Sequence, residues 1–213
     1  ILSAVTPKDN AYTFVGWSVL GNVKQPGDTF TMPAAKVVIS ANWGETAYNI
    51  SYELQEPDAS NHGNNPESYS VSESFTLEEP TLDGYIFDGW TYGEVTIPTK
   101  EVTIPRGTTG DLTFVAHWTV KTYEICIDRD VVDFGSRISG YSGESMQEII
   151  GITSTGNQNV TLKTPVCDND NFVIDVSGLE ASLAGKGGYT EFTVQPKDGL
   201  ADGIYSGTMT VST

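Results

Sequence analysis

The run Asp168-Asn169-Asp170-Asn171 places four oxygen-bearing side chains in succession, a kind of group that can bind calcium. It lacks the ligand spacing and the bidentate glutamate of an EF-hand loop. Asp and Asn also favour tight turns, because their side chains hydrogen-bond the backbone two residues further on. We therefore expect an Asx-rich turn here, and the alternative is a calcium site that uses Asp168 and Asp170.

The other residues with reactive or metal-binding side chains are few and scattered. The two histidines are His62, in a predicted loop, and His117, on a predicted exposed strand face. With only two cysteines, Cys126 and Cys167, no zinc-site spacing exists. No Gly-x-Ser-x-Gly elbow, P-loop or dinucleotide fingerprint occurs, and the Ser and Cys residues have no base to activate them. We expect no enzymatic activity and no cofactor.

The two cysteines form one disulfide or, as we prefer, remain two buried thiols.

Aromatic residues offer a different chemistry, the stacking of rings on sugars. Tyr92, Tyr141 and Tyr189 are candidates for such ligand contacts. The four tryptophans recur at matched positions in a repeat and could form a sugar platform. Aromatic residues that recur at the same place in a repeat more often fill its own core, which is the interpretation that we prefer.

The acidic balance of the chain excludes several classes of partner. There are 28 acidic and 11 basic residues, a net charge of −17, whereas nucleic acids and anionic membranes select clustered Lys and Arg. Residues 1–45 carry no net charge, residues 46–120 carry −10 and residues 121–213 carry −7. Such a surface is typical of a soluble, monomeric, exposed protein. No long apolar stretch and no signal peptide occur. The sequence begins in the middle of a pattern, at Ile1-Leu2, so we expect a fragment of a longer chain.

The elements that position these residues are set by an internal repeat. Tyr12-Thr13-Phe14-Val15-Gly16-Trp17 matches Tyr85-Ile86-Phe87-Asp88-Gly89-Trp90, and the strand that ends at Trp43 matches the strand that ends at Trp118. Alternation predicts strands in these blocks, with Tyr and Phe on one face. The glycine predicts a bend or bulge that turns the tryptophan inward.

The second copy is complete, and the first lacks an opening strand. Tyr48-Asn49-Ile50-Ser51-Tyr52-Glu53-Leu54 opens the second copy as an alternating strand. No helical period is present. We therefore predict a partial repeat over residues 1–45, which leans on its neighbour, and a complete repeat over residues 46–119.

Residues 48–118 resemble the Listeria–Bacteroides repeat, which is also called the B-repeat of internalin B. The resemblance rests on Tyr48-x-Ile50-x-Tyr52-x-Leu54, Asn65-Pro66-x-x-Tyr69, Gly84-Tyr85-x-Phe87-x-Gly89-Trp90 and Ala116-x-Trp118. Residues 11–43 resemble the second half of a related copy. The resemblance implies a β-grasp-like fold, an extracellular location and a place in arrays on bacterial surface proteins, with no catalytic residue.

Residues 120–213 show short alternating runs between turn signals, the pattern of an immunoglobulin-like β-sandwich. We predict strands at 123–128, 131–134, 147–153, 159–162, 172–176, 191–195 and 203–211. The predicted core is Phe134, Ile150, Ile152, Val160, Leu162, Phe172, Ile174, Phe192, Val194, Tyr205, Met209 and Val211. The region resembles the ASPM/hydin-like group of immunoglobulin-like domains, through Val132-Asp133-Phe134-Gly135, Gly140-Tyr141, Phe192-Thr193-Val194 and Gly203-x-Tyr205-x-Gly207-Thr208.

Together these features predict an all-β, non-catalytic segment of a bacterial cell-surface protein. Its role would be structural or adhesive, spacing or presenting other domains and binding host or neighbouring surface proteins weakly. The alternative is a carbohydrate-binding module whose partners are glycans. An accessory domain of an enzyme is a third class that the sequence leaves open.

Overall fold

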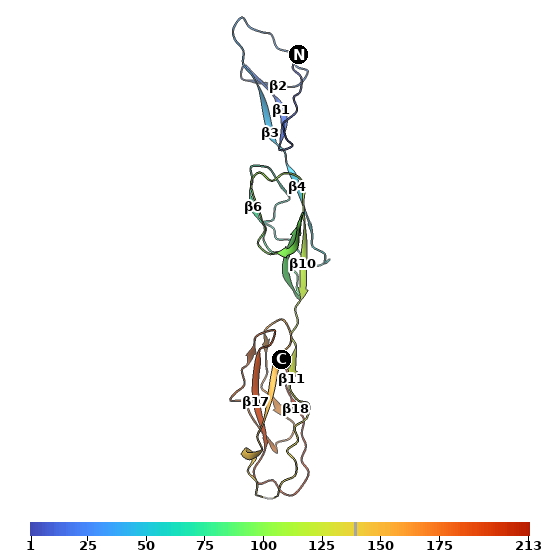
Figure 1. Ribbon diagram of the computed structural model, residues 1–213, viewed down its shortest axis with the longest axis vertical. Coiled ribbons are helices and arrows are strands. Elements are labelled where there is room, and N and C mark those ends of the chain that lie inside the picture. Colours follow the sequence, from blue (N-terminus) through green and yellow to red (C-terminus); the bar gives the residue numbers. More distant parts are fainter. Residues whose placement is uncertain (139) are drawn as a thin grey trace. The chain divides into compact units, whose positions relative to one another are not determined.

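The computed structural model describes residues 1–138 and 140–213, and almost all of its regular structure is β (Figure 1). It consists of two compact units, Ile1–Val120 and Lys121–Thr213. The prediction of an all-β protein made of several sheets is confirmed. The division into domains at residues 45 and 119 stays a prediction.

The first repeat, residues 1–45, is a three-stranded antiparallel sheet. Its central strand is β1 (Tyr12–Val19), with β2 (Asn22–Lys24) on one side and β3 (Ile39–Glu45) on the other. The turn between β1 and β2 has positive φ at Leu20 and Gly21, as a two-residue hairpin requires.

The second repeat, residues 46–119, has a five-stranded mixed sheet in the order β5-β4-β10-β7-β8. The strands are β4 (Tyr48–Glu53), β5 (Ser68–Tyr69), β7 (Tyr85–Tyr92), β8 (Val95–Thr99) and β10 (Leu112–Val120). The first strand, β4, and the last, β10, run parallel in the middle, and the other pairs are antiparallel. A separate pair is formed by β6 (Phe75–Thr76) and β9 (Thr103–Ile104).

A bulge recurs at the same place in both repeats, as the glycines predict. In the first repeat Phe14 lies opposite Trp43 and Gly16 lies opposite Asn42, so Val15 is the extra residue. In the second repeat the shift leaves Asp88 as the extra residue, between Phe87 and Gly89. Gly89 has φ of 141°, and a Cβ atom there would overlap the backbone of Pro98 and Thr99.

The tryptophans confirm the core interpretation in the second repeat and contradict it in part in the first. Trp90 and Phe114 are fully buried (0% exposed), and Trp118 packs against the same core. Trp43 is 42% exposed. The physical reason is that β3 is an edge strand of its sheet, so no strand equivalent to β4 covers it among the described residues.

The two repeats are joined by specific contacts at their boundary. The Tyr48 hydroxyl donates to the carbonyl of Asn10 at 2.8 Å, and the Ser72 hydroxyl donates to the Glu45 carboxylate at 2.7 Å. Hydrogen bonds from Ser70 and Ser72 hold the pKa of Glu45 below its usual value. The first repeat is therefore supported by its neighbour at this boundary.

The second unit, Lys121–Thr213, has a four-stranded antiparallel sheet in the order β11-β12-β17-β15. These strands are β11 (Ile125–Ile127), β12 (Glu148–Ser154), β15 (Phe172–Asp175) and β17 (Tyr189–Pro196). Two short pairs complete it, β13 (Val160–Thr161) with β16 (Ser182–Leu183) and β14 (Val166–Cys167) with β18 (Met209–Thr210). A single turn of 3-10 helix, η1, covers Gly143–Met146.

Most predicted core residues of this unit pack together around Ile150, Ile152, Phe192 and Val194. Two of the predicted strands differ from the structure. Residues 131–134 form no strand, and the run 203–211 is reduced to β18. Tyr205, predicted in the core, is 36% exposed, because its hydroxyl closes a local loop by donating to the carbonyl of Ala201 at 3.0 Å.

Candidate functional site

The outer face of the β11-β12-β17-β15 sheet brings an aromatic ring together with charged groups. Because side chains alternate along a strand, the inward residues Ile150 and Phe192 leave Gly151 and Glu191 facing the other way. The register pairs Gly151 with Glu191 and Thr153 with Tyr189. We call Asp128, Arg129, Glu148, Gly151, Tyr189 and Glu191 the Tyr189 surface.

Gly151 makes room for the Tyr189 ring. A Cβ atom at Gly151 would lie 2.9 Å from Cε2 and from the hydroxyl oxygen of Tyr189, and 3.1 Å from a carboxylate oxygen of Asp128. The ring therefore lies over bare backbone on one side, while 54% of the residue remains exposed. A glycine in the middle of a strand often marks such a close approach.

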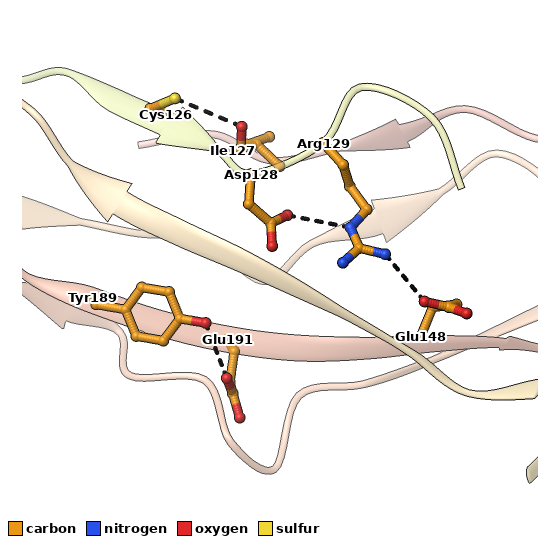
Figure 2. A network of polar contacts seen from close by, with 7 residues as sticks. All are labelled: Cys126, Ile127, Asp128, Arg129, Glu148, Tyr189 and Glu191. Atoms are coloured by element: carbon orange, nitrogen blue, oxygen red, sulfur yellow. Dashed lines mark hydrogen bonds and ion pairs between the residues drawn. The ribbon is translucent and has the colours of Figure 1, made fainter. Parts of the chain in front are cut away.

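The hydroxyl of Tyr189 is held by Glu191. It donates to the Glu191 carboxylate at 3.0 Å, as Figure 2 shows. This hydrogen bond raises the pKa of Tyr189, and the negative charges of Glu191 and Asp128 add to the effect. The neutral phenol is the form that donates this hydrogen bond, and the bond links Tyr189 to Glu191 on the same strand.

Arg129 is the one cation of the Tyr189 surface. Its guanidinium lies 3.5 Å from Asp128 and 3.0 Å from Glu148 (Figure 2). All three side chains are more than a third exposed, so these ion pairs contribute little to stability. The ion pair with Asp128 links Arg129 to a carboxylate that lies, like the Tyr189 ring, against Gly151. A carboxylate next to an apolar ring face can bind a polar molecule with an apolar face.

The other two tyrosines singled out in the sequence lie elsewhere and have their own partners. Tyr92 packs against Phe114 in the second repeat, with ring centroids 5.1 Å apart. Tyr141 donates its hydroxyl to the carbonyl of Lys197 at 2.8 Å. Tyr189 is the most exposed of the three, and the proposal that any of them binds a ligand stays a prediction.

In the acidic run 168–171, the side chains of Asp168 and Asn169 form hydrogen bonds with the backbone. Asp168 accepts from the amide of Thr208 at 2.7 Å, and Asn169 accepts from the amide of Asn171 at 2.9 Å. The Asn169 amide group also donates to the carbonyl of Ser206 at 2.7 Å. In the described part of the chain, no three His, Cys, Asp or Glu side chains are grouped so that they could hold a metal ion.

The histidine and cysteine predictions need correction. His117 is half-buried rather than exposed, and its Nε2 lies 2.9 Å from the hydroxyl of Thr91 on the neighbouring strand. Both cysteines are free thiols, but Cys126 is exposed and Cys167 only half-buried. Cys126 lies opposite Thr153 on the outer face of the sheet, which explains its exposure.

Sequence reasoning identified Tyr189 but missed the residues around it. The alternation Tyr189-x-Glu191 beside the predicted core residue Phe192 places both side chains on the outer face, a signal that was available. Asp128 and Gly151 could not be found in this way, because they lie near Tyr189 only through the pairing of β12 with β11 and β17. Two hollows lie in the second repeat. One, of about 260 Å³, is lined by residues between 66 and 75 and by Arg106, and the other, of about 500 Å³, by residues between 56 and 60 and between 81 and 85.

Comparison with known proteins identifies the first half of the chain. Residues 2–47 match the divergent InlB B-repeat domain, and residues 48–117 match the Listeria-Bacteroides repeat domain, a repeat typical of bacterial surface proteins. The predicted resemblance of both repeats is thereby confirmed, and the ASPM/hydin-like resemblance of residues 120–213 stays a prediction.

A longer relative also matches. It is a protein of Evansella cellulosilytica, provisionally described as a Gly-rich membrane protein, which is 24% identical over 146 residues. The match covers 65% of this chain and 16% of the relative. No solved structure matches. Among the described residues, no helix has the length and apolar character needed to cross a membrane.

Proposed function

Since residues 2–117 carry repeats typical of bacterial surface proteins, we propose that this chain is a non-catalytic structural segment of such a protein. It spaces and presents neighbouring domains outside the cell, with weak binding of host or neighbouring surface proteins. The observation that carries the proposal is the burial of aromatic residues in the second repeat. Trp90 and Phe114 are 0% exposed, so the most characteristic residues of the second repeat build its interior.

The charge distribution supports the same role. Residues 46–120 carry a net charge of −10, and their aromatic side chains pack into one core. The acidic side chains keep such a unit solvated and apart from its neighbours. A unit of this kind is suited to stand in an array on a surface.

The test is a surface display experiment. The chain is anchored to a bacterial cell through its C-terminus and carries a peptide tag at its N-terminus. We expect antibody access to the tag to fall when residues 1–120 are deleted. Access should be restored when an unrelated folded domain of the same length replaces them. Equal access with and without residues 1–120 would contradict a spacing role.

A second candidate function is carbohydrate binding, favoured by the exposed Tyr189 ring over Gly151. A sugar could place its C–H face on the ring, while Asp128 and Arg129 contact its hydroxyls. In a glycan array, Tyr189→Ala should abolish binding, and Gly151→Ala should weaken it by displacing the ring.

The matched control for the glycan array is Tyr123→Ala, because Tyr123 is exposed to a similar degree (58%) on the same unit. Binding that is lost equally in both variants, or no retained glycan at all, would remove this candidate.

A further inference from the structure

The first and last strands of the second repeat are parallel neighbours. β4 pairs with β10 so that Ile50 lies opposite Leu112 and Glu53 lies opposite Val115. The chain enters the repeat at the start of β4 and leaves it at the end of β10. Because the strands are parallel, these two points lie at opposite ends of the pair. Tension along the chain therefore slides one strand past the other and loads their hydrogen bonds together.

Side chains tie this pair along its length. Near the start, the backbone amide of Asn49 donates to the Asp111 carboxylate at 2.7 Å. In the middle, the hydroxyls of Ser51 and Thr113 lie 2.9 Å apart. Near the end, the indole of Trp118 donates to the carbonyl of Leu54 at 2.8 Å. Each tie crosses between the two segments that tension would separate.

The core shields the pair from water on one face. Ile50 and Phe114 are buried, and Tyr52 stacks on Phe114 with ring centroids 5.8 Å apart. β10 is also flanked by β7, whereas β5 pairs with β4 only at Tyr48 and Asn49. Water therefore has poor access to the hydrogen bonds of the pair from the core face.

The first repeat has the opposite geometry. Its outer strands in the chain, β1 and β3, are antiparallel, and Tyr12 at the start of β1 lies opposite Glu45 at the end of β3. Tension at Tyr12 and Glu45 acts at the same end of the pair and opens it one residue pair at a time. The residues before β1 belong to no strand. They are held by the backbone hydrogen bonds of Leu2 with Asp28 and Gly27, at 3.2 and 2.8 Å, and by that from the Trp17 indole to the carbonyl of Ser3 at 2.9 Å.

We propose that the second repeat is a force-resisting module, in which the parallel β4–β10 pair bears tension along the chain, and that the first repeat opens before it. This goes beyond the proposed spacing role, and it holds whether or not the chain spaces other domains.

The test stretches the whole chain, residues 1–213, between handles at its two ends in a single-molecule force measurement. Opening events are assigned by the length of chain released, at most about 3.3–3.6 Å per residue. We expect the release from the first repeat, the shorter of the two repeats, at a lower force than the release from the second repeat. The release from the second repeat should require a several-fold higher force. Opening of the second repeat at or below the force that opens the first would overturn the proposal.

A matched pair of variants separates resistance to force from general stability. Thr113→Ala removes one hydroxyl of the Ser51–Thr113 pair on the loaded strands. Thr103→Ala removes one hydroxyl of an equivalent exposed pair, Thr76–Thr103, 2.8 Å apart on β6 and β9. Both variants should lower the urea midpoint by the same small amount. Only Thr113→Ala should lower the force at which the second repeat opens. Equal loss of force in both variants would overturn the proposal.

A third variant tests the tie at the end of the pair. Trp118→Phe keeps an aromatic ring against the core and removes the hydrogen bond to Leu54. The opening force of the second repeat should fall while that of the first repeat is unchanged. An unchanged force would show that the end of the pair carries no load and would count against the proposal.

Discussion

Trp90 sits at the centre of the second repeat, in contact with the rings of Tyr52, Phe87 and Phe114. Trp90→Ala should cost about 3–5 kcal/mol, because it leaves a large cavity among rings that cannot collapse. The free energy of unfolding from urea titrations, followed by circular dichroism, checks this. Ile97→Ala is the control, since Ile97 is 76% exposed and its loss should change little. Similar losses in the two variants would contradict the core assignment.

Gly89 illustrates how one missing methyl group permits the repeat to bend. Gly89→Ala should destabilise the protein by about 1–3 kcal/mol or more, because its positive φ and the adjacent backbone leave no space for a Cβ atom. Gly63→Ala is the matched control, since no atom lies within 4 Å of the added Cβ there. Thermal unfolding of both variants tests this, and a tolerated Gly89→Ala would argue against the bulge.

Tyr52 makes the stability of the second repeat sensitive to alkaline pH. Burial raises its pKa from 10.0 to about 12. The unfolded chain therefore releases the phenol proton at a lower pH than the folded protein. The stability held by the neutral phenol is complete below pH 10 and is lost as pH rises towards 12.

The measurement is the urea midpoint between pH 9 and pH 12. Tyr52→Phe should flatten the decline without removing it, because burial also raises the pKa of Tyr69. An identical decline in Tyr52→Phe and in the unaltered protein would exclude Tyr52 as its source.

At the scale of elements, local signals were predictable and long-range pairing was not. The block Tyr85–Trp90 could be predicted from its own residues, because the alternation and the glycine indicate a strand with a bulge whichever strand it pairs with. The register of β12 against β17 joins residues that are far apart in sequence, so Gly151 could not be placed beneath Tyr189 in advance. The run 203–211 alternates well, yet β18 covers only Met209–Thr210, because pairing partners decide where a strand forms.

The two repeats should differ in local stability although their blocks match. In β1 and β3, Val19 is the one buried apolar side chain. In β7 and β10 four apolar side chains are buried: Phe87, Trp90, Phe114 and Ala116. Amide hydrogen exchange should therefore be faster in β1 and β3 than in β7 and β10. Equal protection of the two sheets would show that the first repeat is stabilised by more than its own contacts.

At the scale of the whole molecule, the separation at Val120 and Lys121 has a direct consequence. The unit Lys121–Thr213 has its own core, so residues 121–213 expressed alone should fold and keep a cooperative thermal transition. Its near-ultraviolet circular dichroism should match the difference between the full chain and residues 1–120. Loss of the transition in the isolated unit would show that it depends on the repeats.

In the surface array that we propose, the exposed edge strand β3 becomes a place where copies of the chain can meet. The first repeat is electrically neutral, and Ile39 and Trp43 on that edge strand are 37% and 42% exposed, while the rest of the chain is strongly acidic. Copies packed side by side repel one another everywhere except at this neutral part. Contact between neighbouring copies will therefore begin there, and raising the salt concentration will weaken the repulsion that otherwise keeps them apart.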